Sequence, residues 1–216
     1  MTSLLSRLDT NLDACLEGFE GINRFWDRRR NVVVAKILPG EFYVTKNSEM
    51  IATTLGSCVS ACIWDPAVAI GGMNHFMLPL TDELSDNVTW GNVASDATRY
   101  GNYAMEHMIN ELLKHGASRH RLQAKVFGGA KVLRHLTDVG ERNAEFVLRY
   151  LKEENIALLG EDLNDVHPRK VLFDPISGKV LLKQLRSMHN DTITSRERKY
   201  QAGLGKVPVG GDVELF

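Results

Sequence analysis

The sequence lacks several features that would define its class at once. No run of 18 or more apolar residues occurs in the 216-residue chain, so a transmembrane helix is not predicted. Neither sign of charge is in excess, because 26 lysines and arginines stand against 27 aspartates and glutamates. A nearly neutral chain gives no electrostatic reason to bind DNA, RNA or an anionic membrane. We therefore expect no nucleic-acid partner and no membrane insertion.

Cysteine is also scarce. The three cysteines are an odd number, which argues against a disulfide framework and is typical of a reducing compartment. Arg7, Asp9 and Asp13 would interrupt the apolar centre of a secretory signal. The sequence therefore predicts a soluble, cytoplasmic protein, in which a cysteine is of interest for its reactivity.

The composition is otherwise that of a folded globular chain, with 44% hydrophobic and 25% charged residues. Leucines recur at every fourth position from residue 4 to residue 16, and this stripe predicts an N-terminal helical extension over residues 1–30. Residues 31–186 have the length and patterning of one domain. Residues 187–216 are polar and rich in glycine, so we expect a flexible C-terminal tail.

Strand-like segments dominate the predicted domain, and they come in clusters instead of alternating with helices. This order favours an α+β fold, a layered sandwich of mixed or antiparallel strands with two main helices. A turn signal at residues 173–179 predicts a hairpin. The expected helices are Asp96–His115 and about Arg142–Glu154, and the expected strands lie within residues 32–38, 41–45, 50–54, 58–64, 68–78, 122–130, 156–160, 170–173 and 179–185.

One hairpin carries the most informative chemistry. If Pro66 and Ala67 form a two-residue loop, Cys58 lies directly opposite His75 on the neighbouring antiparallel strand. Opposed side chains have Cβ atoms about 4.5 to 5.5 Å apart, within reach of proton transfer from a thiol to an imidazole. A bulge at Gly71-Gly72 or a longer turn would shift this register.

The surroundings of Cys58 suit a nucleophile. Gly56 and Ser57 precede it, and their backbone could approach a substrate and present N–H groups to an oxyanion. The hydroxyls of Thr53 and Thr54, or a backbone carbonyl, are the candidates to orient His75. A simpler interpretation makes Cys58 a small buried hydrophobe and His75 a core histidine.

Other kinds of site fit less well. Cys58 and Cys62 would lie about 13 Å apart on an extended strand, too far to share a metal ion, so no metal and no cofactor is expected. Ser57 lacks the G-x-S-x-G pattern of a serine hydrolase. Gly128 and Gly129 follow a predicted strand without a full nucleotide-binding pattern. We interpret them as a tight turn beside the active strand, with contact to substrate.

Taken together, several motifs resemble the CheD family of chemoreceptor glutamine deamidases. The resemblance spans about residues 37–184. The motifs that carry it are Leu55-Gly56-Ser57-Cys58-Val59, Asp65-Pro66, Gly72, His75-Phe76-Met77-Leu78-Pro79, Lys125-Val126-Phe127-Gly128-Gly129-Ala130, Gly140 with Arg142-Asn143, and Phe173-Asp174-Pro175 with Gly178.

The resemblance implies hydrolysis of glutamine side-chain amides on methyl-accepting chemotaxis receptors, through a thioester on Cys58 with His75 as general base. It also implies a threonine as third member, but the aligned position holds Ala52, so Thr53 is chosen in its place. Gly56, Ser57, Thr54, Gly128 and Gly129 are the expected substrate-binding residues. A CheC-type phosphatase is an expected second partner, and the implied fold is similar to the catalytic domain of deamidating toxins.

A non-catalytic role is the alternative. A degenerate relative would bind chemoreceptors or the phosphatase as an adaptor without chemistry, and Ala52 is the feature that favours it. An enzyme, by contrast, is expected to have an accessible Cys58 thiol with a lowered pKa.

Overall fold

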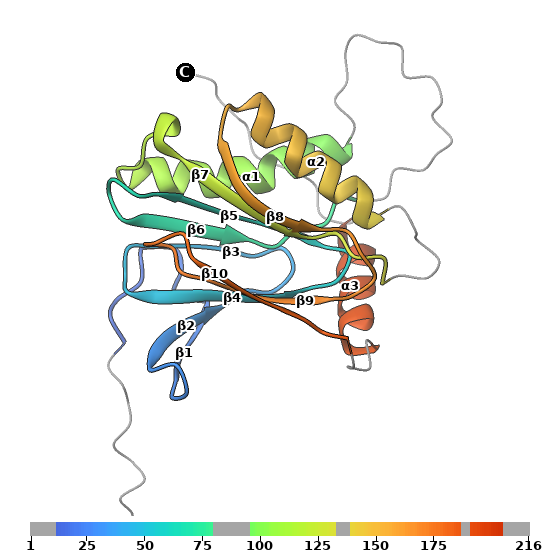
Figure 1. The fold of residues 1–216 in the computed structure, drawn as a ribbon, viewed down its shortest axis with the longest axis horizontal. Coiled ribbons are helices and arrows are strands. Elements are labelled where there is room, and N and C mark those ends of the chain that lie inside the picture. Colours follow the sequence, from blue (N-terminus) through green and yellow to red (C-terminus); the bar gives the residue numbers. More distant parts are fainter. Residues whose placement is uncertain (1–11, 80–95, 133–138, 187–190, 205–216) are drawn as a thin grey trace, which may run out of the picture.

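The structure is a computed structural model that describes residues 12–79, 96–132, 139–186 and 191–204. In these ranges the chain forms two five-stranded sheets and three α-helices, and none of these helices is long and apolar enough to cross a membrane. Figure 1 shows the two sheets stacked, with α1 and α2 over one of them and α3 at one end of the stack. The helices are α1 (Asp96–Lys114), α2 (Val139–Glu153) and α3 (Asp191–Leu204), and the strands are β1 (Asn23–Asp27), β2 (Val32–Lys36), β3 (Phe42–Thr45), β4 (Glu49–Leu55), β5 (Val59–Asp65), β6 (Ile70–Asn74), β7 (Gln123–Gly128), β8 (Ala157–Leu163), β9 (Arg169–Phe173) and β10 (Val180–Gln184).

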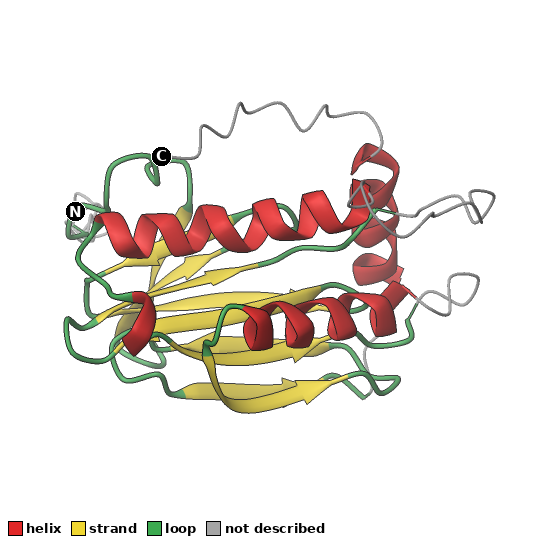
Figure 2. Cartoon of the chain, turned by 90° about the horizontal axis from the view of Figure 1, so that it is seen from above, coloured by secondary structure: helices red, strands yellow, loops and turns green. Residues whose placement is uncertain are grey.

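Both sheets mix parallel and antiparallel pairs. The first has the order β1-β2-β4-β9-β10 and is parallel only between β2 and β4. The second has the order β3-β6-β5-β7-β8 and is parallel only between β7 and β8. Helices α1 and α2 lie over one face of this second sheet in Figure 2, and the first sheet packs against its other face in Figure 1. Strand β5 is therefore covered on both faces, and every one of its residues is buried.

The predicted α+β class is confirmed. Each expected strand segment overlaps one strand from β2 to β10, and the two expected helices overlap α1 and α2. The hairpin expected at residues 173–179 joins β9 to β10, with Val180 paired to Phe173. The helices were predictable because their apolar residues recur at helical spacing, and the strands because they are short runs of β-branched, aromatic and other apolar residues bounded by turn signals.

The N-terminal expectation is wrong for the described part of residues 1–30. Residues 1–11 lie outside the described ranges, and residues 12–30 hold turns and β1 instead of a helix. The Asp27 carboxylate accepts hydrogen bonds from the backbone N–H groups of Arg29 and Arg30, and Asn31 adopts a φ of 54°. This turn reverses the chain, so that β1 pairs with β2.

The expectation of a flexible C-terminal tail is also wrong for part of that segment. Within residues 187–216, which were expected to form a flexible tail, the structure describes α3 over Asp191–Leu204. This helix has little apolar surface of its own, but Ile193 and Glu197 are buried against the rest of the molecule. Packing, not intrinsic hydrophobicity, therefore stabilises the helix.

The β5–β6 connection is longer than expected. Asp65 pairs with Ile70 and Cys62 with Met73, so four residues form the loop, and Ala69 adopts a left-handed φ of 51°. The Asp65 carboxylate accepts the N–H of Ala67 and shapes this turn. The register differs by two positions from the predicted one. An even shift leaves every side chain on its expected face.

Gly71 pairs regularly with Thr45 of β3 and Trp64 of β5, and no bulge interrupts β6 at this position. A Cβ atom at Gly71 would lie 2.5 Å from the Pro175 carbonyl oxygen, where the β9–β10 turn of the other sheet packs against β6. Glycine is needed here because the two sheets approach too closely for a side chain.

We predict that Gly71→Ala lowers the free energy of unfolding by about 1–3 kcal/mol, the usual cost of overpacking. Urea denaturation monitored by circular dichroism measures this change. Gly21→Ala is the matched control, because a Cβ atom there meets nothing within 4 Å. Equal stability of the two variants would contradict the proposed role of the close sheet contact.

Candidate active site

Cys58 lies in the short connection between β4 and β5, and hydrogen bonds from two other elements hold this connection. The N–H of Gly129 donates to the Cys58 carbonyl oxygen at 2.9 Å, and the N–H of Ala130 donates to the Gly56 oxygen at 2.8 Å. The buried Asn143 of α2 donates from Nδ2 to the Ser57 oxygen at 2.8 Å. The backbone before the sulfur is therefore firmly positioned.

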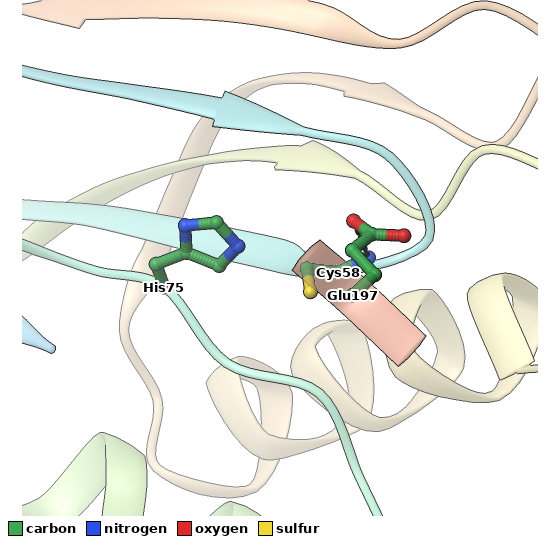
Figure 3. Close-up of side chains that lie close together, drawn as sticks. All are labelled: Cys58, His75 and Glu197. Atoms are coloured by element: carbon green, nitrogen blue, oxygen red, sulfur yellow. Dashed lines mark hydrogen bonds between the residues drawn. The ribbon is translucent and has the colours of Figure 1, made fainter. Parts of the chain in front are cut away.

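His75 follows β6 and reaches the same face of the sheet. An isolated bridge pairs Val59 with Phe76, which continues the β5–β6 register and places Cys58 diagonally across from His75. The expected direct opposition of these two residues is therefore wrong, but the shared face is right. Figure 3 shows the imidazole pointing toward Cys58, with Glu197 of α3 beside the cysteine.

Three potential ligand atoms converge at this point. The Cys58 sulfur, a ring nitrogen of His75 and a carboxylate oxygen of Glu197 lie within 4.8 Å of one another, and all three residues are buried. Diagonal strand positions have Cα atoms about 7–8 Å apart, but long side chains can still meet across that distance. The hairpin thus brings a thiol and an imidazole together by its diagonal geometry.

Thr53 of β4 holds the other side of the imidazole. Its Oγ1 lies 2.7 Å from His75 Nδ1, and it also donates to the Ile37 carbonyl oxygen at 2.9 Å. A hydroxyl has one proton to donate. If the Ile37 oxygen takes that proton, Oγ1 must accept from Nδ1–H, which leaves the lone pair on Nε2. This tautomer is the one that a general base toward Cys58 requires.

The His75 ring is neutral in this environment. Burial and, secondarily, the positive charge of Arg196 lower its pKa from 6.5 to about 3. Nε2 is buried and has no hydrogen-bond partner among the described residues. A neutral imidazole whose Nε2 has no hydrogen-bond partner can accept a proton at that atom.

The depressed His75 pKa predicts a pH dependence of stability. A histidine whose pKa is lower in the folded state contributes its full stability above its unfolded pKa of 6.5, and that stability is lost as the pH falls toward 3. His75→Asn cannot titrate but keeps a donor for Thr53. We expect the variant to lose about 3 kcal/mol less than the wild type between pH 7 and pH 4. Urea denaturation at both pH values tests this, and parallel losses would contradict a buried neutral His75.

Glu197 of α3 lies beside the cysteine and binds the backbone around it. Its Oε1 accepts the N–H of Gly56 at 2.8 Å and the N–H of Cys58 at 3.2 Å. Its Oε2 accepts the N–H of Ser57 at 2.9 Å and the Ser57 hydroxyl at 2.6 Å. Three consecutive backbone N–H groups and one hydroxyl thus converge on a single carboxylate.

This contact changes the expected properties of the thiol. Cys58 has no exposed surface, and burial, together with the negative charge of Glu197, raises its pKa well above the ordinary value. The expectation of an accessible thiol with a lowered pKa is therefore wrong for this conformation. The physical reason is α3, which covers the sulfur and brings a carboxylate beside it.

The remaining predicted residues fall into two groups. Gly56 and Ser57 face the site through their N–H groups. Thr54 pairs with Lys170, and strand alternation places it on the face of β4 opposite Thr53. Gly128 and Gly129 lie next to the Cys58 backbone. A Cβ atom on Gly128, whose φ is 114°, would lie 2.2 Å from the Cys58 oxygen, so this glycine supports the cysteine backbone.

Sequence reasoning missed Glu197 and Asn143. Asn143 accepts the Leu78 N–H at 2.8 Å while donating to the Ser57 oxygen, and so links the segment after His75 to the segment before Cys58. The Arg142-Asn143 pair was visible as a motif without an assigned role. Glu197 left a weaker signal, an acid within a stripe of apolar residues in the C-terminal segment.

Two further properties bear on the chemistry. Cys58, His75 and Glu197 are the residues of the described chain whose donors could together hold a metal ion, but both Glu197 oxygens already accept backbone hydrogen bonds. A cavity of about 240 Å³ is lined in part by His75, Phe76 and Tyr100.

Comparison with known proteins gives a consistent result. A family model described as CheD chemotactic sensory transduction matches residues 77–184. The relative from Hahella chejuensis is 50% identical over 93% of each chain. The relative from Halorhodospira halophila is 52% identical over 94% of this chain and 93% of its own, and that from Methylobacillus flagellatus is 53% identical over 90% and 95%. All three are named probable chemoreceptor glutamine deamidase CheD.

Among solved structures, the hypothetical protein YfiH of Bacillus licheniformis is a distant match. It is 12% identical and has a TM-score of 0.37, and the match covers 56% of this chain and 50% of that protein. This likeness is too weak to indicate a shared function.

Proposed function

The chain belongs to the CheD family, and on this premise we propose that it hydrolyses glutamine side-chain amides of chemoreceptors, with Cys58 as nucleophile, His75 as general base and Thr53 as the residue that positions the imidazole. The observation that carries the proposal is the convergence of the thiol and the imidazole within 4.8 Å. Backbone donors lie on the other side of the sulfur.

The reaction begins with proton transfer. His75 Nε2 accepts the thiol proton, and the Cys58 sulfur attacks the amide carbon of the substrate glutamine. The resulting oxyanion needs N–H donors, and those of Gly56 and Cys58 already converge on one oxygen atom. His75 then returns the proton to the leaving nitrogen, and ammonia departs as the carbon–nitrogen bond breaks.

Water completes the cycle. The thioester carbon accepts a water molecule that loses its proton to His75. Collapse of the second tetrahedral intermediate releases a glutamate side chain and the thiol. The cavity that His75 helps to line is the proposed source of this water. The net reaction converts one amide and one water into one carboxylate and ammonia.

Each conversion adds a negative charge to the receptor. In a bundle of packed helices, a new carboxylate changes the repulsion between neighbouring residues and so shifts the balance between signalling states. Chemoreceptors are thus the proposed partners, and a CheC-type phosphatase is a further proposed partner from the family resemblance. We propose that the reaction takes place in the cytoplasm, where the three cysteines stay reduced. We also propose that residues 31–186 carry the chemistry.

The nucleophile is tested by substitution. We expect Cys58→Ala to lower the deamidation rate by at least about a thousandfold, as loss of a nucleophile does in related chemistry. Mass spectrometry of receptor peptides measures the reaction, because each conversion adds about one dalton. Receptor binding without any mass change in the wild type would support the adaptor alternative instead.

Cys62→Ala is the matched control for this test. Cys62 is equally buried in β5, but it pairs with Met73, away from the site. The variant should keep the wild-type deamidation rate. Loss of activity in Cys62→Ala alone would contradict the assignment of the nucleophile.

Thr53 is tested by a conservative pair of variants. We expect Thr53→Val to lower kcat about tenfold to a hundredfold, because the imidazole loses the partner that fixes its tautomer. Thr53→Ser keeps the hydroxyl and should restore most of the rate. A positioning role also predicts an altered pH profile of kcat in Thr53→Val. An unchanged profile together with an unchanged rate would assign Thr53 to packing alone.

A further inference from the structure

Helix α3 carries a carboxylate in the middle of its buried face. Ile193, Glu197, Tyr200 and Leu204 recur at intervals of four, three and four residues, so they share one face of the helix. Ile193 and Glu197 are almost completely buried, while Tyr200 and Leu204 pack partly buried against the core. The charged residue therefore occupies a position where packing alone would favour an apolar one.

The carboxylate is bound by the groups that the proposed reaction needs. The N–H groups of Gly56, Ser57 and Cys58 all donate to it. A Cβ atom on Gly56 would lie 2.8 Å from both carboxylate oxygens, so glycine is what permits this close approach. A substrate carbonyl cannot use these donors while Glu197 holds them.

Glutamate is also the chemical product of glutamine hydrolysis. The Glu197 side chain has the length of the substrate side chain and carries the carboxylate that the reaction forms, with one oxygen near the Cys58 sulfur. We propose that Glu197 is an internal product mimic, and that α3 holds the enzyme in a self-closed state which must open before a receptor glutamine can enter. This inference rests on the proposed deamidase function.

A second contact fastens the same helix. The Tyr200 hydroxyl hydrogen-bonds to the hydroxyl of Tyr100 on α1. The Tyr200 ring lies against Gly40, where an added Cβ atom would be 3.0 Å from the ring. Gly40 donates its N–H to the His75 carbonyl oxygen. Helix α3 thus contacts the segment that carries Cys58 through Glu197. Through Tyr200 it contacts Gly40, which is itself hydrogen-bonded to His75.

Chemical modification of Cys58 tests the closure without depending on activity. We expect Glu197→Ala in the full-length chain to raise the rate of Cys58 alkylation by iodoacetamide at least about tenfold. The reason is that the thiol loses both its cover and the neighbouring negative charge. Peptide mass spectrometry follows each cysteine separately. An alkylation rate equal to that of the wild type would overturn the proposal.

Two controls separate local opening from unfolding. Lys199→Ala removes an exposed side chain from α3 and should change the alkylation rate less than about twofold. Cys62, which is fully buried in β5, is the internal reference. If Cys62 becomes reactive together with Cys58, the variant has unfolded generally, and the proposed local closure is contradicted.

A second variant turns the mimic into a substrate. Glu197→Gln places an amide where the product carboxylate lies, so the enzyme should hydrolyse its own side chain. Cys58 attacks the amide carbon, ammonia leaves, and water from the side of His75 restores the carboxylate. The expected result is a gain of about one dalton in the peptide that contains position 197. The double variant C58A/E197Q should show no such gain.

The outcomes distinguish this inference from the function on which it rests. If E197Q is not converted while the wild-type enzyme converts receptor peptides, Glu197 does not occupy a substrate-like position, and the product-mimic assignment is overturned. If neither amide is converted, the deamidase function itself fails, and the alkylation rates still decide whether α3 closes the site. Conversion of both amides, with faster receptor conversion by Glu197→Ala, supports the inference.

Discussion

The antiparallel pairing of β5 with β6 is the constraint on which the chemistry depends. Side chains on a strand alternate between two faces, so a cysteine at the start of one strand and a histidine just after its partner meet only when their positions have the right parity. The four-residue loop and the expected two-residue loop have lengths of the same parity, and both place Cys58 and His75 on one face. A three-residue loop would have separated them.

Short β-branched and apolar runs between turn signals predicted the strands, but the exact partner of Cys58 depended on the loop. Nothing in the residues around Pro66 shows that Ala69 adopts a left-handed φ of 51°, which is uncommon for alanine. The face of β4 on which Thr53 lies, by contrast, can be inferred from the sequence. Ile51 and Leu55 lie on the inner face of β4, and Thr53 shares their parity, whereas Ala52 belongs to a separate cluster on the other face. The apolar residues of the strand thus select the threonine that can face the site.

Helix α3 could not be predicted in the same way. Its buried face interrupts the apolar residues with an acid, so the segment has the composition of a solvated tail. The groups that make a buried Glu197 favourable lie about 140 positions earlier in the chain. Every residue except proline has a backbone N–H group, so residue types do not show which N–H groups converge. Their convergence here results from the path of the backbone at residues 56–58. A site built from the backbone is therefore visible in three dimensions but not in the sequence.

The strength of the Glu197 contact decides whether the closed site can open. When Glu197 leaves the site, its carboxylate and the N–H groups that bound it form hydrogen bonds with water instead. A hydrogen bond to a charged group contributes about 1.5–3 kcal/mol, and part of this gain is offset by the desolvation of the carboxylate. The apolar contribution of α3 is small, since only Ile193 among its apolar residues is nearly fully buried. A glutamine-bearing segment can compete with this contact, because its side-chain carbonyl recovers the same N–H donors and the thiol loses an adjacent negative charge.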